Sequence, residues 1–308
     1  MLKQRVITAL ILVAILLPTL WVEALWPFAL LSLLFVAAAG WEWARLNEAP
    51  GVPAWGLGAA VAGTGLLLAG QWGLPVWQAL PEGQSASQGH VHALTETLVG
   101  FTVPAPLWWG AALVWLLGGA MALRHGSQHW RAVPMALRAV LGLALLVVAW
   151  LALAEAKLQG LNFLLSILCL VWAADIGAYF GGRAFGRRKL APSISPGKSW
   201  EGVLAGALAV QALAALWLWV DAHVGVDSPS LYSHLRQGLG APGMVLAVLA
   251  LTGMSVVGDL FESLIKRQAG AKDSSQLLPG HGGVLDRIDA LLPVLPLSMA
   301  LMSLCHGW

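Results

Sequence analysis

The stretch "PGHGGVLDRIDALLPVLPLSMALMSL", residues 279–304, places a cluster of charged side chains directly before an apolar segment. The second half of the stretch carries no charged residue and is hydrophobic enough to enter a lipid bilayer. Four ionisable residues precede it, beside two adjacent glycines: His281, Asp286, Arg287 and Asp289. A membrane span that begins with so many ionisable groups predicts both a class of fold and the place of a functional site.

The composition of the whole chain agrees with a membrane location. Of 308 residues, 58% are hydrophobic and only 10% are charged, and the mean hydropathy is +0.76. Soluble domains carry about 25% charged residues, so the sequence predicts an all-α, polytopic integral membrane protein surrounded by lipids, with no nucleic-acid partner. Cys169 and Cys305 both fall in apolar runs, which indicates packing residues and argues against a disulfide framework or a zinc site.

Runs of about 20 apolar residues are long enough to cross the hydrocarbon core. The sequence predicts nine such spans, and a tenth candidate around residues 72–80 is too short and contains a proline. The first run follows two basic residues and is too long for a signal peptide, so we expect it to be an uncleaved helix. The predicted spans are Val6–Val22, Leu25–Trp43, Ala54–Gly70, Pro106–Leu123, Met135–Ala154, Leu161–Phe180, Trp200–Val220, Ala241–Leu264 and Ile288–Leu304.

The distribution of basic residues predicts the orientation. With nine spans, fifteen of the 17 Lys and Arg residues fall on the side of the N-terminus, and only Lys157 and Arg236 fall on the other. The positive-inside rule then predicts a cytoplasmic N-terminus and an outward-facing loop between residues 71 and 105. We expect residues 1–134 to form an N-terminal transmembrane region. Residues 135–308 are expected to form a C-terminal transmembrane catalytic region with its active site facing the cytoplasm.

The end of the sixth predicted span contains a carboxylate within an apolar run. An ionised Asp175 would cost about 2.5–3.5 kcal/mol at the centre of a bilayer, so it is a functional candidate. A purely structural pairing with Arg183 is the alternative. The basic residues that follow, Arg187 and Arg188 among them, attract an anionic headgroup or nucleotide, or serve only as orientation charges.

The seventh predicted span opens with "SISPGKSWEG", which contains the last three residues of a P-loop pattern. That pattern requires a glycine where Pro192 stands, and no strand is expected before the segment, so the P-loop interpretation fails. The start of a helix still attracts phosphate, with Ser195 or Ser199 as the cap. Lys198 adds a mobile cation, and Glu201 is expected to orient Lys198 or to bind metal. A plain capped helix is the alternative.

The eighth predicted span ends with polar residues at intervals of three and four, which places them on one helix face. These are Ser255, Asp259, Glu262 or Ser263, and Lys266. Asp286 and Asp289 begin the ninth span, which is antiparallel to the eighth, so the three aspartates are expected to converge. Converging carboxylates need a cation between them, and ligation by oxygen alone indicates Mg²⁺ or a similar hard ion.

The residues around the three aspartates fit a polyphosphate. Gly282 and Gly283 allow backbone N–H groups to approach a phosphate closely. Four basic or ionisable side chains are expected to surround it: Lys266, Lys272, His281 and Arg287. The cluster therefore predicts a metal and polyphosphate site at the cytoplasmic end of the bundle.

The segment from Ser263 to Asp289, "SLIKRQAGAKDSSQLLPGHGGVLDRID", resembles the signature of the phosphatidate cytidylyltransferases, or CDP-diacylglycerol synthases. Upstream stretches between Asp175 and Gly202 are similar to further elements of that family. The resemblance implies condensation of CTP with phosphatidic acid, Mg²⁺ with a second cation such as potassium, and a homodimer. We expect the protein to lie in a cell inner (cytoplasmic) membrane. It assigns Asp259, Asp286 and Asp289 to the metal centre.

On this interpretation the phosphate groups are neutralised by Lys266, Lys272, His281 and Arg287, while Lys198 and the arginines near Arg187 hold the lipid phosphate. A CTP-dependent lipid kinase acting on a polyprenol or phytol is an alternative within the same chemistry. A transporter is the alternative from another class, because intramembrane acids and glycine-broken helices also serve ion pathways.

Overall fold

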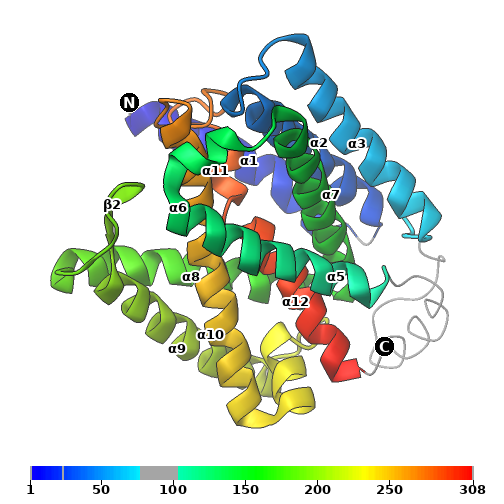
Figure 1. The fold of residues 1–308 in the computed structure, drawn as a ribbon. Helices are drawn as coiled ribbons and strands as arrows, with labels where there is room; N and C mark the ends of the chain where they lie inside the picture. The colour runs from blue at the N-terminus through cyan, green and yellow to red at the C-terminus, as the bar shows by residue number, and fades with distance from the viewer. Residues whose placement is uncertain (1, 23, 77–102, 307–308) are drawn as a thin grey trace.

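The computed structural model describes residues 2–22, 24–76 and 103–306, and it is a bundle of long helices (Figure 1). The first group of elements is α1 (Leu2–Trp21), α2 (Leu25–Leu46), α3 (Val52–Gln71), α5 (Ala105–Leu113), the π-helix η1 (Val114–Gly118) and α6 (Gly119–Ala132). The second group is α7 (Met135–Gln159), α8 (Leu161–Phe185), β1 (Lys189–Ala191), β2 (Ser195–Ser199), α9 (Trp200–His223), α10 (Leu231–Gln268), α11 (Leu285–Ile288) and α12 (Leu291–His306).

The prediction of a polytopic helical membrane bundle is confirmed. Among the described residues, eight helical segments are long and apolar enough to cross a membrane, and a ninth apolar helix, Val6–Trp21, is shorter. Each of the nine predicted spans corresponds to one of these segments. The tenth candidate forms no helix over residues 72–76, and its remainder, with most of the predicted outer loop, lies outside the described residues.

Three details of the helices differ from the predictions. The helix α10 begins ten residues before the predicted eighth span and is interrupted at Gly240, where φ is 70°. The ninth predicted span is divided into the short α11 and the longer α12. A two-stranded antiparallel hairpin, β1–β2, precedes α9, so the expectation that no strand lies there was wrong.

Small residues bring the C-terminal helices close together. In the contact between α8 and α9, a Cβ atom on Gly206 would lie 2.7 Å from the carbonyl oxygen of Ala174. In the contact between α10 and the start of α12, a Cβ atom on Gly258 would lie 2.4 Å from the carbonyl oxygen of Asp289. Such close packing is typical of helices in membranes. It sets the acidic part of α10 directly beside the residues that lead into α12.

The predicted site residues collect at one end of the bundle, which we call the basic end. It contains the end of α2, the ends of α8 and α10, the β1–β2 hairpin, α11, and the loop of residues 269–284, which we call the 269–284 loop. The start of α1 reaches the same end, because the Thr8 hydroxyl donates to the carbonyl oxygen of Pro279. Figure 1 shows the N-terminus beside this loop.

Candidate functional site

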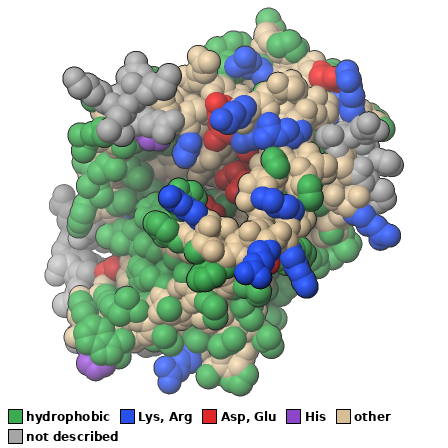
Figure 2. Space-filling model, turned by 90° about the vertical axis from the view of Figure 1, so that its left-hand side faces the viewer, with side chains coloured by type: hydrophobic (Ala, Val, Ile, Leu, Met, Phe, Trp, Pro, Cys, Tyr) green, Lys and Arg blue, Asp and Glu red, His purple; other side chains and the backbone are tan. Residues whose placement is uncertain are grey.

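A hollow at the surface of the bundle combines both signs of charge. In Figure 2, acidic side chains lie inside the hollow and Lys and Arg side chains surround it. Two of the ion pairs at the basic end join different elements around the hollow: Lys198 with Asp259, and Lys266 with Asp286. Side-chain contacts therefore connect the β1–β2 hairpin, α10 and α11 at this end of the bundle.

The first ion pair connects the β1–β2 hairpin to α10. The Lys198 ammonium contacts the Asp259 carboxylate, and both side chains are about one third exposed or less. Asp175, exposed on α8, lies within electrostatic range of both partners. The described residues contain no ion pair between Asp175 and Arg183, so the structural alternative for Asp175 is not supported.

The second ion pair is more deeply buried. The Lys266 ammonium lies 2.7 Å from Asp286 Oδ1 and also contacts the carboxylate of Glu262, one helical turn earlier on α10. The exposed fractions of the three side chains are 14%, 8% and 4% respectively. Ser263 donates a hydrogen bond of 3.4 Å to Asp259, so the predicted polar face of α10 is confirmed.

Asp286 is held on its other edge by the 269–284 loop. Its Oδ2 atom accepts hydrogen bonds from the backbone N–H of Ser274 at 2.9 Å, from the Ser274 hydroxyl at 3.0 Å, and from the backbone N–H of Gly283 at 2.7 Å. The Gly283 N–H was predicted to approach a phosphate, but the structure places it against this carboxylate. The adjacent Gly282 has a φ of +86°, and a Cβ atom there would lie 2.7 Å from Asp286 Oδ2.

Asp289 occupies the corner between α10 and α12. Its Oδ1 accepts a hydrogen bond of 2.7 Å from the next backbone N–H, that of Ala290. The charges of Asp259 and Glu262 both act on this carboxyl group. The close approach at Gly258 explains the position, because it removes the space that would otherwise separate the two helices.

The donor set can be tested against the predicted divalent ion. Among the described residues, no group of three or more His, Cys, Asp or Glu side chains is arranged ready to hold a metal. Five carboxyl groups nevertheless lie close together, with two lysines between them: those of Asp175, Asp259, Glu262, Asp286 and Asp289. Oxygen donors alone fit the chemistry of Mg²⁺, and two of these carboxylates, those of Asp259 and Asp286, are paired with Lys198 and Lys266.

The arginines after α8 are oriented through their backbone. The carboxylate of Glu201, in the first turn of α9, accepts hydrogen bonds of 3.0–3.2 Å from the backbone N–H groups of Arg187 and Arg188. Glu201 therefore supports the arginine segment, and Lys198, which it was expected to orient, pairs with Asp259. Both arginine side chains are exposed and available to an anion.

The remaining predicted residues lie on elements of the same basic end. The Ser199 hydroxyl caps α9 by accepting a hydrogen bond of 3.2 Å from the Gly202 N–H, as one of the two predicted caps. The Arg287 guanidinium donates to the carbonyl oxygen of His281, with an Nε–O distance of 3.1 Å, and Lys272 is exposed. Arg287 thus connects α11 to the end of the 269–284 loop.

Sequence reasoning missed one acid at this end. Glu42 on α2 is completely buried, and its carboxylate accepts hydrogen bonds from the 269–284 loop and from the start of α11. A signal was present, because Glu42 stands in the apolar run "AAAGWEWARL". The argument that singled out Asp175, the cost of a carboxylate in an apolar span, applies equally to it.

The fold and the site together define a polytopic membrane protein with a polar, ion-paired site at one end. Comparison with known proteins identifies its family: the model described as the Cytidylyltransferase family matches residues 3–305. The chain belongs to this family. A phosphatidate cytidylyltransferase of Pseudomonas aeruginosa is 38% identical over 310 residues, covering 100% of this chain and 99% of the relative.

Two further relatives carry the same name. The protein of Haemophilus influenzae is 35% identical over 305 residues, which cover 96% of each chain. The protein of Brucella melitensis is 44% identical over 133 residues, covering 43% of this chain and 44% of the relative. The resemblance drawn from the residues between Asp175 and Asp289 is thus confirmed, and it extends over the whole chain.

Proposed function

We propose that this protein transfers the cytidylyl group of CTP to phosphatidic acid, forming CDP-diacylglycerol and pyrophosphate. The observation that carries the proposal is the pair of lysine–aspartate contacts, Lys198 with Asp259 and Lys266 with Asp286, at one end of a membrane bundle. Membership in the cytidylyltransferase family supports the transferred group. The names of the full-length relatives support the lipid acceptor.

The reaction requires charge neutralisation more than proton transfer. A phosphate oxygen of phosphatidic acid forms a bond to the α-phosphorus of CTP, while the bond from that phosphorus to the β-phosphate oxygen breaks and pyrophosphate leaves. The attacking oxygen is already anionic, so no strong general base is needed. Transfers of this kind are catalysed mainly by positioning and by electrostatic stabilisation.

The residues of the site divide between the two substrates. Lys198 and the exposed arginines Arg187 and Arg188 lie on the hairpin side, where they would hold the lipid phosphate. Lys266, with Lys272 on the adjacent loop, would neutralise the pyrophosphate. When each lysine turns to a phosphate oxygen, its aspartate partner is freed.

We propose that Mg²⁺ is held by Asp259, Asp286 and Asp289, with a second cation such as potassium nearby. The bound metal would supply Lewis-acid stabilisation of the CTP phosphates. The excess of carboxyl groups over lysines supports this assignment. Asp175 and Glu262 add further negative charge around the same position.

The basic end would face the cytoplasm, where CTP is available, and the bundle would lie in the cytoplasmic membrane. The charge distribution supports this orientation, since fifteen of the 17 basic residues fall on the side of the N-terminus. We also propose that the protein is a homodimer, as the resemblance to the family implies.

The decisive experiment supplies the purified chain in detergent with phosphatidic acid and a polyprenol, Mg²⁺, and CTP labelled either in the cytidine or in the γ-phosphate. We expect the cytidine label in the lipid product and the γ-label in pyrophosphate. A lipid that carries only the γ-label would identify a CTP-dependent lipid kinase. Solute flux in proteoliposomes without CTP would identify a transporter, and either result would contradict the proposal.

A further inference from the structure

Glu42 is a buried acid that the proposed reaction does not use. Its carboxylate is 0% exposed and lies within hydrogen-bond distance of four donors on a single distant segment. The backbone N–H groups of Val284 and Leu285 donate at 2.9 and 2.6 Å, and the hydroxyl of Ser274 donates at 3.2 Å. The hydroxyl of Ser275 provides the fourth contact. These bonds join α2, in the N-terminal region, to the loop that carries the site.

The partners of Glu42 are neutral groups. Within the described part of the chain, no Lys, Arg or His side chain forms an ion pair with this carboxylate. A buried carboxylate without a cation remains stable only where several hydrogen-bond donors surround it, as they do here. Neutral backbone donors cannot move to a substrate, so the contact belongs to the framework of the site.

Ser274 connects this framework to the reactive side chains. Its hydroxyl lies 3.2 Å from Glu42 Oε2 and 3.0 Å from Asp286 Oδ2, and its single hydrogen serves one acid at a time. Gly283 lies in the same corner, where there is no room for a side chain. A Cβ atom there would lie 2.4 Å from Glu42 Oε1 and 2.0 Å from Ser274 Oγ. The loop therefore packs against Glu42 without free space.

We propose that Glu42 is a positioning residue for cytidylyl transfer. It fixes the loop through Ser274, Ser275 and the start of α11, and the loop in turn holds Asp286 Oδ2, so that Oδ1 is presented to the site. The effect on turnover rests on the proposed function, whereas the effect on the loop does not. The inference also gives the N-terminal region a role that its sequence alone does not reveal.

The hydrogen-bond pattern predicts which substitution disturbs the loop most. Oε1 of Glu42 receives the Ser275 hydroxyl and the Val284 N–H, and Oε2 receives the Ser274 hydroxyl and the Leu285 N–H. In Glu42→Gln, the new amide nitrogen faces a backbone N–H in either orientation. A hydroxyl can rotate and accept, but a backbone N–H cannot. Glu42→Gln should therefore release one backbone contact, while Ser275→Ala removes a single hydroxyl.

The test measures the loop and the reaction separately on the purified full chain in detergent. Hydrogen exchange of peptides covering residues 270–285 reports the loop, and kcat and KM for CTP and phosphatidic acid report the reaction. For Glu42→Gln we expect faster loop exchange and a kcat lower by about 10- to 100-fold, as is common when supporting contacts of a metal site are lost. The KM for phosphatidic acid should stay unchanged. Ser275→Ala should change both measurements in the same direction by less.

Glu155→Gln is the matched control, because it neutralises another buried acid, on α7, away from the loop. It should match the wild type in both measurements. Wild-type loop exchange and turnover in Glu42→Gln would overturn the inference, as would faster exchange spread evenly over all helices. If Glu42→Gln does not fold, unchanged loop exchange and kcat in Ser275→Ala would overturn it. A wild-type chain without cytidylyl transfer would instead contradict the proposed function, and loop exchange would still test the contact.

Discussion

The two ends of the bundle both contain carboxylates, but they satisfy them in different ways. At the basic end, Asp259 and Asp286 are paired with the ammonium groups of Lys198 and Lys266. At the opposite end, Asp221 accepts hydrogen bonds from hydroxyl, amide and backbone donors. An ammonium group on a flexible stem can move to a phosphate and leave its acid to a metal, whereas local neutral donors hold an acid in place. The choice of partner thus separates a reactive site from a structural one.

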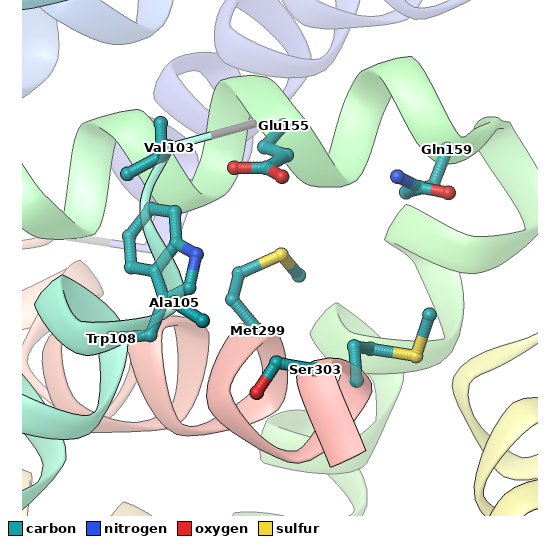
Figure 3. A pocket seen from close by; sticks show the side chains of 8 residues that line it. Val103, Ala105, Trp108, Glu155, Gln159, Met299 and Ser303 are labelled. Carbon is teal, nitrogen blue, oxygen red and sulfur yellow. The ribbon is translucent and has the colours of Figure 1, made fainter. Parts of the chain in front are cut away.

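The same comparison applies to the two most buried acids of the N-terminal and central helices. Glu42 has four donors, whereas Oε2 of Glu155 has no hydrogen-bond partner among the described residues. Glu155 lines a cavity of about 10 Å³ at the opposite end, beside Trp108 and Met299 (Figure 3). That volume suits about one water molecule. None of the residues that line this cavity belongs to the proposed site.

The largest effect on turnover is expected from neutralising the aspartates at the basic end. Asp286→Asn and Asp289→Asn should each lower kcat by roughly 10³-fold, because the charge stabilisation supplied at such a centre is worth several kcal/mol. Thermal unfolding in detergent should show that both variants remain folded. Asp221→Asn, at the opposite end, is the control and should keep its turnover while losing some stability. Near-wild-type turnover of either site variant would remove that aspartate from the metal assignment.

The sequence was sufficient to predict the bundle and the polar face of α10. Apolar segment length predicted the nine helices, and the three- and four-residue spacing correctly placed Asp259 and Lys266 on one face of α10. Segment length and residue spacing are both properties of a single segment, so they can be recognised without knowing how the segments pack. The division of the last span into α11 and α12 was not predictable in this way, because it depends on contacts with α2 and α10.

The second effect concerns the buried ion pair of Lys266. Lys266→Met leaves Glu262 and Asp286 adjacent without a cation, and loss of one partner of a buried pair typically costs about 3–5 kcal/mol. We expect a lower unfolding temperature in detergent together with loss of turnover. The double variant Lys266→Met/Glu262→Gln should regain much of the stability and none of the activity. Recovery of activity in the double variant would show that Lys266 acts only through the fold.

The partners of each acid could not be predicted from the sequence. The contact of Lys198 with Asp259 was not predicted. Glu201 was expected to orient Lys198 or to bind metal, but the structure places it against the arginine backbone. Glu42 was missed, although its apolar context was visible, because its donors lie more than 230 residues later in the chain. Pairing across such separations is decided by tertiary packing, which a single sequence does not encode as a local pattern.

A smaller effect is expected from Glu201, which is partly exposed and holds only backbone groups. Glu201→Gln loses one of two acceptor oxygens and should allow the segment of Arg187 and Arg188 to move. We expect the KM for phosphatidic acid to rise by about tenfold, the lower end of the range for supporting contacts. The KM for CTP should not change. Steady-state kinetics with each substrate varied in turn would measure this, and equal changes in both KM values would contradict a role on the lipid side.

The smallest effect is expected at Glu155, and it tests whether the two ends are independent. Glu155→Gln keeps the side-chain volume and replaces an acid that lacks one partner with a neutral amide, which is less costly to bury. Turnover should therefore equal that of the wild type, and the unfolding temperature in detergent should stay the same or rise. Loss of turnover in this variant would mean that the cavity at the opposite end communicates with the site. The two ends could then no longer be treated as separate, and the distinction between lysine-paired and neutrally paired acids would not be enough to locate the chemistry.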